Sequence, residues 1–136
     1  MRLAFSCVIT TFCLALAPAH AAWAQNYPFE LARADPLAFA AWRWVVPAQF
    51  RNTPWIGSLN GAAGLMSRVT MRQKLFYYGK VCIAYDCRGN FAAFLIAADG
   101  SEAAGLVQSR ALGVGNLYFG APDDEARQLL VVKILQ

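Results

Sequence analysis

The sequence predicts an α+β domain in which N-terminal helices pack against a central antiparallel sheet of about five strands. Three observations lead to this prediction. Helix signals are concentrated between residues 35 and 47, apolar strand patterns begin at Leu65, and the later strands are separated by short turns. Helical segments followed by strands with hairpin connections are typical of an α+β domain with an antiparallel sheet.

The segment 1–24 has the layout of a secretory signal peptide. Arg2 precedes an apolar run from Leu3 to Ala17, and small residues follow. A basic start, an apolar centre and a small-residue cleavage site define such a peptide. The alternative is an uncleaved membrane anchor. The apolar run is shorter than the roughly 20 residues that span a bilayer, and Pro18 interrupts it, which favours the signal peptide.

Removal of this segment changes the composition from which function is argued. We expect cleavage after Ala24, with Ala21 as the second site, and export of residues 25–136 as one domain into the periplasm. The single histidine is lost with the segment, and the formal net charge falls from +4 to +3 because Arg2 is removed. A chain without histidine has no Ser-His-Asp triad and no histidine-ligated metal site. Without a run of Lys and Arg, nucleic acid is not expected as a partner.

A helix is predicted directly after Asp35, which is an N-cap residue followed by proline at the first helical position. Pro47 ends this helix. Apolar residues cover most of its circumference, so we expect it to pack beneath another element, with Trp42 and Trp44 in the core or at its rim.

Strand patterns occupy much of the remaining chain. Predicted strands cover residues 65–71, 75–82, 90–98, 103–110 and 129–135. The dipeptide Asp99-Gly100 is a strong hairpin turn signal. The acidic residues at 123–125 are interpreted as a turn or as the first turn of a short helix, since they follow a proline.

Two cysteines lie at the tip between the second and third predicted strands. Cys82 and Cys87 are separated by four residues, and in an oxidising compartment they are expected to form a disulfide. A ring of this size contributes about 2 kcal/mol in the chain-entropy model. It either staples the end of a hairpin or fixes a binding loop so that less entropy is lost when a partner binds. The side chains at the tip favour binding: Ile83, Ala84, Tyr85, Asp86 and, just outside the ring, Arg88.

No pattern for catalysis accompanies this loop. The carboxylates are scattered along the chain, and no glycine-rich phosphate loop is found. We therefore expect a binding protein rather than an enzyme, with no cofactor and no metal.

The loop and its surroundings resemble the inhibitor of vertebrate lysozyme family, whose exported bacterial members carry a Cys-Lys-Pro-His-Asp-Cys loop. The resemblance covers about residues 36–135. It is carried by Cys82, Asp86 and Cys87 in the loop, and outside it by Pro54-Trp55-Ile56, Val69-Thr70 and Ala104-Gly105-Leu106.

This resemblance implies a central antiparallel sheet with packed helices, and inhibition of lysozyme by insertion of the loop into the active-site cleft. In the family, the loop histidine reaches the two catalytic carboxylates. Here Ile83, Ala84 and Tyr85 stand in place of Lys, Pro and His. A neutral phenol donates one bond of roughly 0.5–1.5 kcal/mol, against roughly 1.5–3 kcal/mol for a charge-assisted bond. We expect Tyr85 to be the main contact, Arg88 to supply a cation, and Asp86 to cap its own turn by accepting backbone N–H bonds.

Two functions remain as hypotheses. The first is inhibition of a lysozyme or lysozyme-like muramidase through the loop 82–87. The second is a periplasmic interaction or envelope protein that keeps the fold and has lost the lysozyme target. The predicted protein is a monomer or a homodimer, without a membrane span once the signal peptide has been removed.

Overall fold

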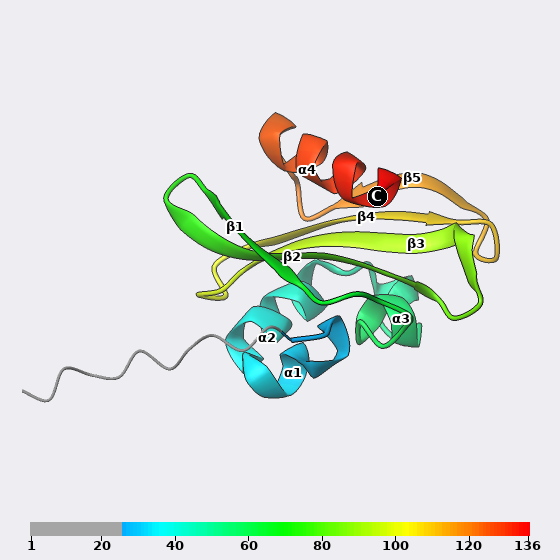
Figure 1. Cartoon of the computed structure of the whole chain (residues 1–136), viewed down its shortest axis with the longest axis horizontal. Coiled ribbons are helices and arrows are strands. Elements are labelled where there is room, and N and C mark those ends of the chain that lie inside the picture. Colours follow the sequence, from blue (N-terminus) through cyan, green and yellow to red (C-terminus); the bar gives the residue numbers. More distant parts are fainter. Residues whose placement is uncertain (1–25) are drawn as a thin grey trace, which may run out of the picture.

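Five antiparallel strands, paired in sequence order, form the centre of the structure (Figure 1), a computed structural model that describes residues 26–136. The strands are β1 (Ser67–Met71), β2 (Lys74–Ile83), β3 (Asp86–Ala97), β4 (Ala103–Ser109) and β5 (Val114–Phe119). The predicted α+β class is confirmed. The predicted signal peptide lies outside the described residues, so its cleavage stays a prediction.

The N-terminal helices cover one face of this sheet (Figure 1). They are η1 (Pro28–Glu30), α1 (Leu31–Ala34), α2 (Pro36–Val45), η2 (Ala48–Phe50) and α3 (Pro54–Gly57). The predicted helix after Asp35 is confirmed as α2. The Asp35 carboxylate caps it by accepting a hydrogen bond from the backbone N–H of Ala38 at 3.1 Å.

The two tryptophans of α2 have opposite environments. Trp42 is fully buried, lies 6.0 Å from Phe94 between ring centroids, and donates from Nε1 to the carbonyl of Ile56 at 2.8 Å. Trp44 is 81% exposed, so its predicted place in the core or at its rim is wrong. The helix packs on the sheet along one face only, and the other face points away from the core.

The last element, α4 (Asp124–Leu135), covers the opposite face of the sheet (Figure 1). The prediction of a strand over residues 129–135 is therefore wrong, and β5 is the fifth strand instead. The acidic stretch does begin a helix, because the Asp123 carboxylate accepts from the backbone N–H of Ala126 at 2.9 Å. The physical reason for the helix is the second apolar face of the sheet, which has to be covered. The buried residues between this face and α4 are Met71, Phe76, Tyr78, Ala93, Leu95, Ala97, Ala104, Leu106, Ala126 and Leu130.

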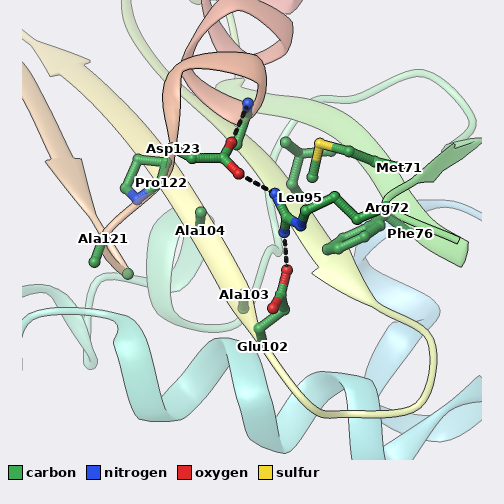
Figure 2. Close-up of a pocket in the computed structure, with 12 residues that line it drawn as sticks. Met71, Arg72, Phe76, Leu95, Glu102, Ala103, Ala104, Ala121, Pro122 and Asp123 are labelled. Carbon is green, nitrogen blue, oxygen red and sulfur yellow. Dashed lines mark hydrogen bonds and ion pairs between the residues drawn. The ribbon is translucent and has the colours of Figure 1, made fainter. Parts of the chain in front are cut away.

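One arginine fastens α4 to the sheet. Arg72 lies in the two-residue turn between β1 and β2, where it and Gln73 have positive φ, as type I′ hairpin turns require. Its guanidinium forms ion pairs with Glu102 before β4 and with Asp123 at the start of α4 (Figure 2). Arg72 lies beside a cavity of ≈ 120 Å³ that is lined largely by apolar side chains.

Candidate binding site

The disulfide loop (residues 82–87) closes the β2–β3 hairpin at one end of the sheet, as predicted. A bond joins Cys82 to Cys87, whose Cα atoms are 5.1 Å apart. Ile83 pairs with Asp86, which leaves a turn of two residues. The loop is therefore a narrow, covalently closed hairpin tip.

Tyr85 is the second residue of this turn and has an unusual backbone conformation. Its φ is +66°, in the left-handed region that is rare for bulky residues. Its side chain is fully exposed, at 106% of the reference area. Strained residues of this kind persist where the surrounding structure holds them and cluster at binding sites, which makes Tyr85 a candidate contact residue.

The base of the loop is held from both sides. Cys82 is buried, and its backbone N–H and C=O each bond to Ala62 at 3.0 Å. On its other side Cys82 pairs with Phe91, and the register then shifts, so that residues 87–90 of β3 form a long, bulge-like irregularity without paired positions on β2. A bulge bends its strand and redirects the residues beyond it. The loop is thereby aimed by the sheet rather than left to move as a free end.

Two buried polar side chains connect the loop to the neighbouring β4–β5 turn. Asn90 donates from Nδ2 to the Asp86 carboxylate at 2.9 Å and accepts at Oδ1 from the Ser109 hydroxyl at 2.7 Å. The same Oδ1 accepts from the backbone N–H of Ala111 at 3.0 Å, and the Ser109 hydroxyl accepts from that of Leu112 at 3.1 Å. Such a satisfied buried network gives the groups a single arrangement.

The predicted role of Asp86 differs from its observed contacts. We predicted that it caps its own turn through backbone N–H bonds. Instead, its carboxylate is bound by the side-chain amide of Asn90 and lies 3.9 Å from the guanidinium of Arg110. The carboxylate therefore orients the loop through β3 and the β4–β5 turn.

Sequence reasoning placed one cation at this end of the sheet, and the structure places two. Arg88 and Arg110 line an open groove of ≈ 680 Å³ beside the loop, together with Gly89, Gln108 and Asn116. Arg110 was missed because it comes from a different hairpin. The strand order could have predicted its position, because the β2–β3 and β4–β5 turns of a meander lie at the same end of the sheet. With Asp86 as the neighbouring carboxylate, the loop end has an excess of positive charge.

The predicted site residues are thus only partly brought together. The turn presents Ala84 and Tyr85 to solvent, with Asp86 and Arg88 exposed beside them, whereas Ile83 packs partly against the core. Within residues 26–136, no group of three potential metal ligands is found. In the same part of the chain, no helix has the length and apolar character needed to cross a bilayer.

The Arg72 cavity is a weaker candidate site. The Arg72 guanidinium is already paired with two carboxylates, and the other residues that line the cavity are largely apolar (Figure 2). The arrangement is explained by its structural role at the start of α4.

No family model matches this sequence, and no curated protein matches it.

Proposed function

We propose that this protein is an exported inhibitor of a lysozyme-type muramidase and that it acts by inserting the disulfide loop into the active-site cleft. The observation that carries the proposal is Tyr85, fully exposed at the tip of a disulfide-closed hairpin. The loop sequence supports it through Cys82, Asp86 and Cys87, which match the pattern of the lysozyme inhibitors it resembles.

The proposed target offers groups that complement this tip. A retaining glycosidase has two carboxyl groups roughly 5 Å apart in its cleft. The Tyr85 hydroxyl donates a hydrogen bond to one of them, and the ring fills part of the space that a sugar would occupy. Tyrosine is frequent among the residues that dominate binding energy because it combines apolar area with a hydroxyl.

Charge and rigidity assist the same interaction. Arg88 and Arg110 bring positive charge to the rim of an acidic cleft, which accelerates encounter more than it adds affinity. The disulfide and the Asn90–Ser109 network keep the loop in one conformation before binding. A preordered loop loses less entropy when it enters the cleft. The protein performs no chemistry of its own in this mechanism; it occupies the place of the substrate.

The test is a titration of the purified exported protein against a panel of lysozymes and lytic transglycosylases. Inhibition is followed by the clearing of a cell-wall suspension, and binding is followed by calorimetry. Tyr85→Ala is the loop variant, and Phe29→Ser is the matched control, because Phe29 is also an exposed aromatic but lies on η1.

The proposal requires inhibition of at least one enzyme of the panel, weakened by Tyr85→Ala and unchanged by Phe29→Ser. If the protein binds none of the enzymes in the panel, the proposal is rejected. Such a result would favour the alternative, an envelope interaction protein that keeps this fold without the lysozyme target. The substitutions at residues 83–85 relative to the family pattern are the observation that supports this alternative.

A further inference from the structure

The helix α2 carries a second apolar face that nothing in the described chain covers. Leu37, Ala40 and Trp44 are spaced three and four residues apart, so they form one row on the helix surface. Leu37 is 69% exposed and Trp44 is 81% exposed. The opposite face, with Ala38 and Trp42, is fully buried against the sheet. A helix in this position needs one apolar face for its own fold, and the row 37–40–44 is additional to it.

Positive charge borders this row. Arg43 and Arg51 line an open groove of ≈ 520 Å³ together with Phe39 and Trp44. Arg43 donates to the carbonyl of Gly57 at 3.2 Å, and Arg51 donates from Nε to the carbonyl of Val46 at 3.2 Å. Both guanidinium groups are held by backbone carbonyls, and in the described part of the chain neither forms an ion pair with a carboxylate.

We propose that this face of α2, the row Leu37–Ala40–Trp44 with Arg43 and Arg51, is a docking surface for anionic phospholipid membranes. The charges indicate the partner, because guanidinium groups without carboxylate partners complement lipid phosphates. The apolar row indicates how deeply the helix enters the membrane. A helix with one short apolar row lies at the membrane–water interface and does not span the bilayer. Tryptophan is enriched at this level of a membrane because its ring is amphipathic.

The side chains favour a lipid over a glycan. A sugar-binding surface presents flat aromatic rings and polar groups that bond to hydroxyls. Leu37 offers neither, although it is one of the two most exposed apolar side chains of the row. An acyl-chain boundary, in contrast, accepts an aliphatic side chain and an indole together.

The docking surface and the disulfide loop are compatible with each other. The helices α1–α3 lie under one face of the sheet, whereas the β2–β3 turn extends at its end (Figure 1). A protein held by α2 therefore keeps the loop accessible. The membrane proposal does not depend on the proposed inhibition, and each can fail alone.

The experiment measures binding to vesicles of phosphatidylglycerol in phosphatidylcholine, about 30% anionic, and to vesicles of phosphatidylcholine alone. The exported protein is used, with its N-terminus established by intact mass, and every variant carries the same N-terminus. Sedimentation gives the partition coefficient. Tryptophan emission gives a second readout, since Trp44 is the exposed tryptophan of the described chain while Trp42 and Trp55 are buried.

The expected result is binding to the anionic vesicles with a blue shift of the emission, and little binding to the neutral ones. Trp44→Ser should lower the partition coefficient about tenfold, as expected for one large apolar side chain. Arg51→Gln should lower it about fivefold at low salt and less at high salt. Tyr85→Ala should bind like the wild type. Circular dichroism establishes that each variant is folded.

Three results would overturn the proposal. The first is equal binding to neutral and anionic vesicles, and the second is binding that Trp44→Ser leaves unchanged. The third is absence of vesicle binding; if Trp44-dependent sedimentation on purified peptidoglycan accompanies it, the surface binds a glycan instead.

Discussion

The hydroxyl of Ser109 donates to Oδ1 of Asn90 over 2.7 Å, and both side chains are 99% shielded from solvent. Because Asn90 in turn holds the Asp86 carboxylate, two strands and two turns share one polar connection. Removal of either partner leaves buried polar groups without hydrogen bonds.

Asn90→Ala should therefore lower the free energy of unfolding by about 1–3 kcal/mol, the cost of unsatisfied buried groups. Urea denaturation measures the change. The matched control is Asn116→Ala, an exposed asparagine on β5, which should stay within about 0.5 kcal/mol of the wild type. Equal effects of the two substitutions would show that the Asn90 network does not stabilise the fold.

Tyr85→Gly separates the backbone strain of the turn from the function of its side chain. The left-handed conformation costs an L-residue about 1–2 kcal/mol, and glycine adopts it freely. The variant should be at least as stable as the wild type in thermal unfolding, yet bind the target muramidase about thirtyfold more weakly, as expected for loss of this side chain. A marked loss of stability would mean that the Tyr85 ring supports the fold, against its full exposure.

Tyr85→Ala and Tyr85→His test the proposed contact. Alanine should weaken binding by about 2 kcal/mol or more, a factor of roughly thirty, with little change in melting temperature. Histidine should tighten binding to an animal lysozyme, most clearly near pH 6, where imidazole is partly charged. Calorimetry with one lysozyme compares all three proteins. If alanine and tyrosine bind alike, the loop has no part in the interaction.

Reduction of the Cys82–Cys87 bond should leave the fold largely intact while it weakens partner binding. Cys82 keeps its backbone bonds to Ala62 after reduction, and the ring is small and lies at the end of the sheet. Before reduction, intact mass should equal residues 25–136, or 22–136, less two hydrogens, with no reactive thiol. Near-UV circular dichroism follows the fold, and its collapse on reduction would identify the bond as a structural staple.

Leu130→Ala tests whether α4 covers the second face of the sheet. Leu130 is fully buried, and its truncation should destabilise the protein by about 2–5 kcal/mol. Val132, on the same helix, is 48% exposed, so Val132→Ala should have a much smaller effect. Urea unfolding of both variants gives the comparison. A strand over residues 129–135 would place these two side chains on the same face and make their effects similar.

Stability at alkaline pH should depend on Tyr78. Its hydroxyl donates to the carbonyl of Leu129 in α4, and burial raises the pKa of the phenol above its ordinary value of 10.0. The fold therefore favours the neutral phenol, and this contribution is complete below pH 10 and is lost as pH rises through the folded-state pKa. Desolvation lowers the pKa of the neighbouring Lys133, whose effect on stability has the opposite sign.

The measurement is urea unfolding of the wild type and Tyr78→Phe between pH 8 and pH 12. Lys133 is present in both proteins, so the difference between the two curves isolates the phenol. We expect Tyr78→Phe to lose less stability with rising pH. Parallel curves would show that the phenol ionises equally in the folded and unfolded states.

Local signals predicted much of the fold. Asp35 and Pro36 mark the start of α2, and Asp99-Gly100 lies in the turn between β3 and β4, where Gly100 has a φ of +74°. The error over residues 129–135 has a nonlocal cause. A short apolar run rich in β-branched residues fits a buried strand or a buried helix equally well, and periodicity does not separate them. The deciding factor is the uncovered second face of the sheet, which exists only after the strands have assembled.

The candidate site, like the fold, was predicted from the sequence only where local signals decide the structure. The position of the disulfide loop at a hairpin tip follows from two neighbouring strands and their cysteines. Its anchoring does not, because Asn90, Ser109 and Arg110 meet only through the pairing of β3 with β4. The prediction for Trp44 was wrong for a related reason. An apolar residue on a helix is expected in the core, and the local sequence does not show which face of the helix the sheet will cover.

The strand order β1-β2-β3-β4-β5 has a consequence for the folding reaction. Every strand pairs with its neighbour along the chain, so short loops close first and little chain entropy is lost before contacts form. The two cysteines are five positions apart, and the β2–β3 hairpin alone brings them together. Hairpins close in microseconds, whereas disulfides form in seconds or longer. Residues 26–136 contain just these two cysteines, so within this part of the chain oxidation after folding or during it gives the same single product, and no rearrangement of mispaired bonds is required.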